Sequence, residues 1–176
     1  MKQRKAVLIS ENFTPIVDDV HNVEFSYESH IRLGDEVLIL TCDFSQYRFM
    51  RSYSIRMDLL YNRNGENHRA LVISSHADAE NGRVTLKLIE VPQELRHSGL
   101  GTQIFICWLR VLEHVAKLFQ IYFSEIWGNI ADGSGFDSQI SCKLYKKFHR
   151  YVCFGDKRLI LNYKKLRNSY LEYAIQ

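Results

Sequence analysis

The hydrophobic period of this sequence changes close to residue 100. Before that point apolar residues alternate with polar ones, as in the segment 23–27, and this pattern predicts β-strands. In the segment 102–119 the apolar residues recur three and four positions apart, which predicts one long amphipathic helix. A run of strands followed by such a helix is typical of an α+β domain, in which the helix covers a mostly antiparallel sheet.

Turn signals divide the first half into several strands. An Asn-Gly pair within 62–67 predicts a tight hairpin, and 77–82 predicts a second turn. Strands are expected over 23–27, 36–44, 54–61, 68–76 and 83–91. Together they predict a meander of four or five antiparallel strands, in which Val84, Leu86 and Leu88 share one face.

The second half is expected to contain two more strands and one more helix. Strands are predicted over 121–127 and 158–163, a polar glycine-bearing loop over 128–138, and a helix over 139–151. The tail from Lys164 is basic and aromatic and follows no clear period. The sequence shows no repeat and no linker, so we expect residues 1–176 to form a single domain.

Composition excludes several classes of protein. A net charge of +3 permits an anionic ligand, but it is far from the clustered cations of a DNA-binding surface. The four cysteines form no C-x-x-C pair, so we interpret them as small buried residues in a reducing compartment and expect no metal site. No apolar window approaches the roughly 18 residues of a membrane span. We therefore expect a cytoplasmic protein without a membrane partner.

The junction between the last of these strands and the long helix carries a candidate binding loop. A helix N-terminus offers unpaired N–H groups and a partial positive charge, which together attract anions. Gly99 and Gly101 lack a Cβ and allow the backbone to approach a ligand closely. Arg96 adds a cation and Thr102 a hydroxyl group. The expected ligand group is a phosphate or pyrophosphate, and the alternative is a plain helix-capping turn.

Two common phosphate-binding loops do not fit this junction. The Walker loop requires a lysine after its last glycine, and the dinucleotide fingerprint requires a third glycine. What remains is R-x-x-G-x-G over residues 96–101, preceded by Val91-Pro92. This arrangement resembles the first signature of the GNAT family, the acyl-CoA-dependent N-acetyltransferases.

A second segment extends this resemblance to about residues 83–163. The segment 141–155 is similar to the family's tyrosine helix, with matches at Leu144, Tyr145 and Lys147, although Phe148-His149 replaces the usual Gly-Phe. The N-terminal third departs from the family, because it is predicted to form strands where the family has two helices that shape the acceptor site. The resemblance implies a GNAT-like fold with acetyl-CoA as co-substrate.

The resemblance also implies a set of cofactor-binding residues, in which the loop amides hold the pyrophosphate of CoA. These residues are Val91, Arg96, His97, Ser98, Gly99, Leu100, Gly101, Thr102 and Asn129. Asn129 fits the family pattern least well, since more residues separate it from Tyr145 than is usual in the family. By the same resemblance, the Val91 N–H would stabilise the oxyanion and Tyr145 would protonate the leaving thiolate.

Glu90 is the candidate general base. It is expected at the end of its strand, on the same face as Leu86 and Leu88, where partial desolvation would make its carboxylate a stronger base. The simpler alternative is a solvated glutamate at a strand end.

Three functions stay open at this point. The first is an N-acetyltransferase that moves an acetyl group from acetyl-CoA to a primary amine by direct attack through a tetrahedral intermediate. The second is a non-catalytic GNAT-like domain that binds CoA or a protein partner. The third, a nucleic-acid module, is suggested by the tyrosines and cations of the tail. The acceptor, the acyl chain length and a homodimeric state are not set by the sequence.

Overall fold

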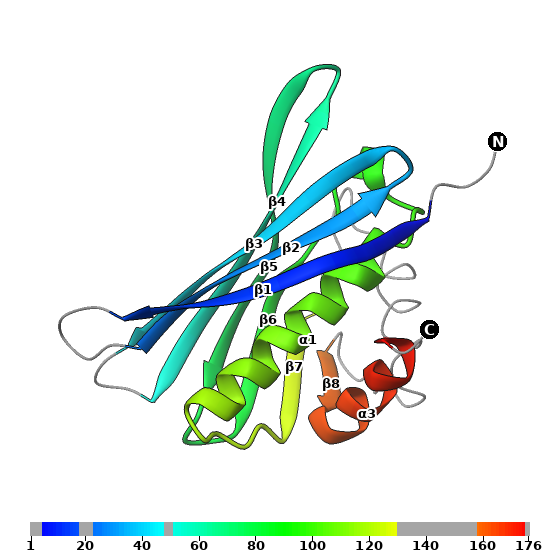
Figure 1. The fold of residues 1–176 in the computed structure, drawn as a ribbon. Helices are drawn as coiled ribbons and strands as arrows, with labels where there is room; N and C mark the ends of the chain where they lie inside the picture. The colour runs from blue at the N-terminus through cyan, green and yellow to red at the C-terminus, as the bar shows by residue number, and fades with distance from the viewer. Residues whose placement is uncertain (1–4, 18–22, 48–50, 130–157, 175–176) are drawn as a thin grey trace.

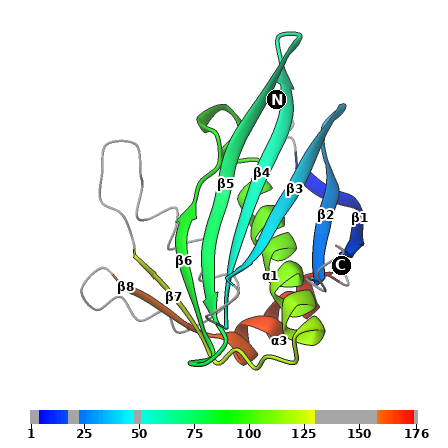
Figure 2. The same cartoon turned by 90° about the vertical axis from the view of Figure 1, so that its left-hand side faces the viewer.

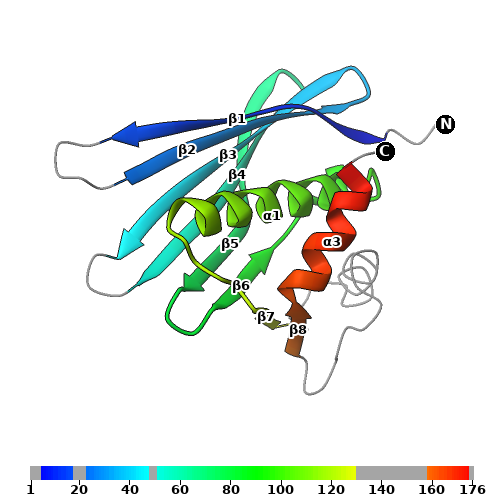
Figure 3. The ribbon, with the colours of Figure 1, turned by 60° about the horizontal axis from the view of Figure 1, so that its bottom comes forward.

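A computed structural model describes residues 5–17, 23–47, 51–129 and 158–174 of the chain. These residues confirm the expected α+β class, because they form one mixed, mostly antiparallel eight-stranded sheet with helices packed on one side (Figures 1 and 3). The strands lie side by side in the order in which they occur in the sequence. They are β1 (Ala6–Val17), β2 (Val23–Leu33), β3 (Glu36–Tyr47), β4 (Ser52–Arg63), β5 (Glu66–Asp78), β6 (Arg83–Ile89), β7 (Glu125–Asn129) and β8 (Arg158–Asn162).

The predicted meander is confirmed and is longer than expected, since β1 to β6 are all antiparallel. Strand β1 was not predicted. It contains Pro15, and its register with β2 shifts between Leu8 and Ser10, so its alternation is irregular. Both features are tolerated because β1 is the edge strand, where a missing N–H donor and a bulge cost little.

The hairpin between β4 and β5 forms where the Asn-Gly pair predicts it. Asn64 and Gly65 both have positive φ, at 53° and 86°, as a tight two-residue hairpin turn requires. In Figure 1 the tip of this hairpin projects beyond the neighbouring strands.

The long helix is also confirmed, as α1 (Leu100–Leu118). Its apolar side packs on the sheet, and Trp108 is fully buried there, donating its indole N–H to Ser75 Oγ at 3.0 Å. The thiols of Cys42 and Cys107 are buried and free, as expected for small core residues. No helix among the described residues is both long and apolar enough to cross a membrane.

His114 on α1 packs between aromatic rings of the first two strands. Its ring stacks on Phe13, with 4.2 Å between centroids, and meets Phe25 edge-on at 4.8 Å. Burial lowers the pKa of His114 below its usual value near 6.5, and the nearby Lys117 lowers it further. The neutral imidazole is therefore the form that fits this position.

We expect the free energy of unfolding to decrease as the pH falls below about 6.5. The unfolded chain then binds a proton at His114 that the folded chain resists, so protons favour unfolding. Replacing this residue (His114→Phe) should flatten the pH dependence in that window, measured by urea unfolding at several pH values. An unchanged slope in the variant would assign the pH dependence to other groups.

The register of β6 corrects one prediction about its faces. Leu86 lies opposite Ser75, but Leu88 lies opposite Ser74, because the pairing with β5 shifts by one residue between them. Residues directly opposite each other in an antiparallel pair share a face, so Leu86 and Leu88 point to opposite faces. The expectation that Glu90 lies on the same face as both is therefore wrong.

The strand after α1 begins later than predicted. Residues 121–124 are outside β7, although Ile121 and Phe123 are buried and Tyr122 is exposed, which imitates a strand pattern. The N–H of Ile121 instead bonds to Ala116 O at 2.9 Å, in the turn that ends α1. Pairing with β6 starts only at Glu125.

The chain closes with β8 and a helix that the sequence did not predict. Asn162 is the last residue of β8. Its side-chain oxygen accepts a hydrogen bond from the Lys165 N–H at 2.9 Å, so Asn162 caps α3 (Tyr163–Ala174). Arg167 on α3 donates to Glu113 on α1 at 2.8 Å, which places the two helices side by side (Figure 3). The loop and helix predicted over 130–151 lie outside the described residues.

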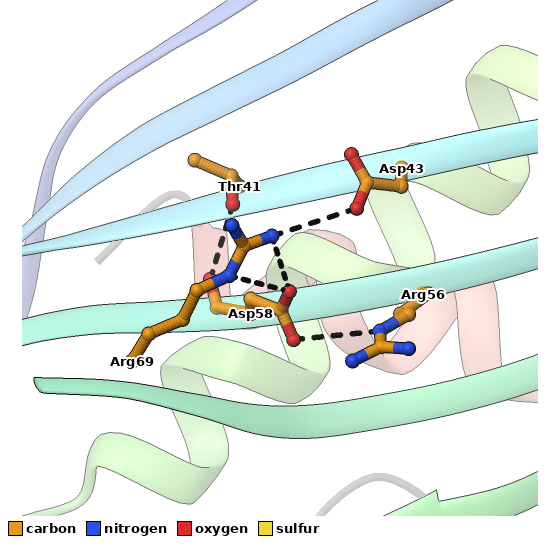
Figure 4. Close-up of polar contacts among 5 residues, drawn as sticks. All are labelled: Thr41, Asp43, Arg56, Asp58 and Arg69. Atoms are coloured by element: carbon orange, nitrogen blue, oxygen red, sulfur yellow. Dashed lines mark hydrogen bonds and ion pairs between the residues drawn. The ribbon is translucent and has the colours of Figure 1, made fainter.

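The face of the sheet opposite the helices carries a buried carboxylate. Figure 2 looks onto this face, with α1 behind the strands. The Asp58 side chain is only 3% exposed, and Arg69 donates to its Oδ2 from Nε and Nη2 at 2.8 and 2.6 Å (Figure 4). Arg56 lies 3.6 Å from Oδ1, and Thr41 donates to the Asp58 carbonyl. The two arginines balance a charge that would otherwise be costly to bury.

Candidate functional site

The candidate site lies where the only parallel pair of the described sheet separates. Strands β6 and β7 pair over four positions, from Arg83 opposite Glu125 to Leu86 opposite Gly128. Beyond Leu86, β6 continues to Ile89 while β7 turns away, and Figure 2 shows the two strands diverging. Among the described residues, this opening between parallel strands leaves backbone groups of β6 without a partner strand on that side.

The chain leaves β6 through Glu90 and Val91. The Glu90 N–H still bonds to Val72 O on β5 at 2.8 Å, although the strand itself ends at Ile89. For the Val91 N–H there is no acceptor among the described residues, whereas the Val91 carbonyl accepts Arg96 Nε at 3.0 Å. One backbone donor is thus available next to the point where the strands separate.

The loop before α1 is held in a left-handed conformation at two positions. His97 has a φ of 64° and Gly99, which precedes the helix, a φ of 81°. Ser98 fixes the turn between them, because its hydroxyl donates to Leu95 O at 2.7 Å and accepts the Leu100 N–H at 3.3 Å. Left-handed backbone is favourable for glycine but costs energy at His97, so the loop is specified by its surroundings.

Gly101 has a different role from Gly99. A Cβ at Gly101 would lie 3.3 Å from Val91 Cγ2, so the missing side chain allows α1 to pack closely on the end of β6. At Gly99 an added Cβ would meet no atom within 4 Å, and the loop there faces open space. The close packing at Gly101 holds the start of α1 beside the strand opening. The open space at Gly99 leaves room next to it.

The start of α1 presents backbone donors. The N–H groups of Thr102 and Gln103 bond to Gly99 O at 3.0 and 3.3 Å. For the N–H groups of Gly99 and Gly101, no acceptor is present in the part of the chain that the structure describes. Donors at a helix N-terminus fit an anionic group such as a pyrophosphate.

Arg96 points back toward the strand end. Its Nε donates to Val91 O, and its Nη2 lies 3.6 Å from Glu90 Oε1, with 26% of the side chain exposed. The structure therefore brings the candidate base Glu90 into an ion pair with Arg96, a contact that the sequence analysis did not anticipate. Within the described ranges, no group of three or more potential metal ligands is present.

The remaining candidate residues are only partly placed. Asn129 is the last residue of β7 and lies opposite Arg158 of β8. Tyr145, the candidate acid, lies outside the described residues, as does the rest of the segment similar to the tyrosine helix. The described site thus consists of the β6 end, the loop and the first turn of α1.

Three contacts around the site were missed by sequence reasoning. The Ala6 N–H of β1 bonds to Ser98 O at 2.8 Å. Tyr61 and Arg63, at the end of β4, both donate to Glu94 just before the loop. No sequence signal could have revealed them, because each joins segments at least 30 residues apart.

Comparison with known proteins leaves the chain without an assigned family. No protein-family profile matches the sequence, and no curated protein matches it significantly. Two solved structures align with most of the chain. A mutant of the AtaT toxin, bound to the C-terminus of the antitoxin AtaR and acetyl-CoA, is 12% identical, with a TM-score of 0.39 over 77% of this chain and 72% of that one. A KacTA–DNA complex is 16% identical, with a TM-score of 0.39 over 79% and 76%. These likenesses are too distant to assign a family or a function.

Proposed function

We propose that the protein is an acyl-CoA-dependent N-acyltransferase that transfers an acetyl group from acetyl-CoA to a primary amine. The observation that carries this proposal is the opening between the parallel strands β6 and β7, with the start of α1 directly beside it. The opening would receive the extended thioester arm, and the N–H groups of Gly99 and Gly101 would hold the pyrophosphate. The loop resemblance supports the same co-substrate.

The candidate residues then have distinct roles in the transfer, and of these only Tyr145 lies outside the described residues. The Glu90 carboxylate would take a proton from the attacking amine, which is mostly protonated in water at neutral pH. The Val91 N–H would donate to the oxygen of the acetyl carbonyl as it gains negative charge. Tyr145 would return a proton to the thiolate that leaves. Arg96 would keep Val91 oriented through its bond to the Val91 carbonyl.

Thermal unfolding with acetyl-CoA tests the co-substrate. Acetyl-CoA or CoA at about a hundred times its Kd should add about 2.7 kcal/mol, which raises the melting temperature by several degrees, whereas ATP and NAD should not. Gly99→Ala should remove most of this rise, because it adds a side chain in the open space beside the loop, where the pyrophosphate is proposed to bind.

Gly65→Ala is the matched control for this experiment. Gly65 has a similar positive φ, 86°, and an added Cβ there would also meet no atom within 4 Å. Both variants therefore carry the same kind of backbone strain, but only Gly99 lies at the loop. An equal rise in both variants would contradict the role of the loop in binding, and a larger rise with ATP or NAD would contradict the proposed co-substrate.

A second candidate function is a domain that binds CoA or a protein partner without turnover. It is favoured by the N-terminal half, because residues 6–17, 23–33, 36–47, 52–63 and 66–78 are strands, and no described helix precedes Gln93. The described residues before Gln93 thus contain neither of the two helices that shape an acceptor site in the GNAT family. Binding of acetyl-CoA without release of free thiol, across a panel of amines, would favour this function over the enzyme.

A further inference from the structure

The tip of the β4–β5 hairpin contacts the segment that leads into the candidate loop. That segment is η1 (Gln93–Leu95), a single turn of 3₁₀ helix. Glu94 Oε1 accepts two hydrogen bonds from the end of β4, one from Tyr61 Oη at 3.1 Å and one from Arg63 Nη1 at 3.2 Å. One carboxylate oxygen of η1 is therefore tied to two side chains of the hairpin.

The surroundings of Glu94 favour its charged form. Its own backbone N–H lowers the pKa of the Glu94 carboxyl, and Tyr61, Arg63 and His68 lower it further, while partial burial acts in the opposite direction. The ring of Tyr61 is held by stacking on His68, with 5.4 Å between centroids. Tyr61, Arg63 and His68 all come from the hairpin, so this side of the contact is preassembled.

A continuous set of bonds connects Glu94 with the first turn of α1. Within η1, the Leu95 N–H bonds to Pro92 O at 2.9 Å. Leu95 O accepts the Ser98 hydroxyl, and the same hydroxyl accepts the Leu100 N–H. A shift of η1 would therefore be passed to the turn that contains Gly99.

We propose that the β4–β5 hairpin is a latch that sets the conformation of the loop 96–101 through Glu94. Tyr61 and Arg63 are positioning residues in this latch, because they act on the loop without facing the expected ligand. The effect of the latch on acetyl-CoA affinity rests on the proposed function. The effect of the latch on the conformation of the loop does not depend on that function. The left-handed conformation of His97 is strained by itself, which is why the loop needs such an external contact.

The test combines amide hydrogen exchange with acetyl-CoA binding in the double variant Tyr61→Phe, Arg63→Met. Without ligand, the amides of Leu95, Arg96 and Leu100 should exchange about five- to tenfold faster, because both bonds to the charged Glu94 are lost. Acetyl-CoA affinity should fall by a similar factor, since the binding conformation of the loop is less populated.

Asn67→Ala is the matched control. Asn67 accepts a bond from Asn62 at 3.1 Å in the same hairpin, whereas the bonds to Glu94 come from Tyr61 and Arg63. This variant should leave both loop exchange and affinity unchanged. The single variant Arg63→Lys keeps Tyr61 and a cation near Glu94. It should therefore retain part of the slow loop exchange and part of the acetyl-CoA affinity that the double variant loses. If the arginine had only a structural role, the lysine would retain neither.

The outcomes separate the latch from the proposed function. Unchanged exchange of Leu95, Arg96 and Leu100 in a folded double variant would overturn the latch. Equal acceleration in Asn67→Ala would also overturn it, because the effect would then be general loosening of the hairpin. If the unaltered protein does not bind acetyl-CoA, the proposed function fails, and the exchange experiment still decides whether the latch exists.

Discussion

Gly82→Ala is expected to lower the free energy of unfolding by about 3 kcal/mol, or roughly 6–12 °C in melting temperature. Gly82 has a φ of 62°, and an added Cβ would lie 2.8 Å from the Tyr122 carbonyl oxygen. The Gly82 carbonyl also accepts the Ser124 N–H at 2.7 Å. The substitution therefore strains the turn before β6 and pushes away the segment that leads into β7. Urea or thermal unfolding measures the loss.

Gly65→Ala separates the two contributions to this effect. Its φ is 86°, but no atom lies within 4 Å of the added Cβ, so it carries the backbone strain without the clash. We expect a cost of about 1 kcal/mol there. Similar costs at Gly65 and Gly82 would mean that the close approach of the Tyr122 carbonyl to the added Cβ costs no stability.

Glu90→Gln is expected to lower acetyl transfer by about a hundred- to ten-thousandfold if the protein is the proposed enzyme. Glutamine keeps the size of the side chain but does not take a proton from the amine. The affinity for acetyl-CoA should stay nearly constant, because Glu90 lies at the strand end and not among the loop donors. Release of free CoA thiol with a reactive amine gives the rate, and the thermal shift gives the affinity.

The neighbouring Arg96 provides the control for Glu90. Its Nη2 lies 3.6 Å from Glu90 Oε1, so Glu90→Gln also weakens this ion pair. Arg96→Met removes the pair from the other side and leaves the carboxylate in place. If both variants lose activity equally, and both also lose acetyl-CoA affinity, Glu90 acts by holding Arg96 and another group takes the proton.

The parts of the fold that the sequence predicted are those governed by local patterns. Strands β2 to β6 follow from alternation and from turns such as Asn64-Gly65, and the ends of α1 lie within two residues of the prediction. The helix α3 was missed because Lys164 and Lys165 occupy its first turn, where the helix dipole disfavours cations. Tertiary contacts such as that of Arg167 with Glu113 support it instead.

The same distinction holds for the candidate site. The loop 96–101 could be found because all of its residues are contiguous and glycine has a defined role at positive φ. The ion pair of Arg96 and the side-chain orientation at β6 could not, since a one-residue register shift between Leu86 and Leu88 decides which way they point. The bonds from Tyr61 and Arg63 to Glu94 span 33 and 31 residues and leave no mark on the local pattern.

The order of the strands has a consequence for how the protein is made. Strands β2 to β6 each pair with the strand synthesised just before, through short connections. A growing chain can therefore add one strand at a time to an existing edge, with a small entropic cost of loop closure at each step. The pair of β6 and β7 is different, because the whole of α1 must emerge and fold back first. The strand opening depends on that pair, so it forms late in synthesis, on a sheet that is already in place.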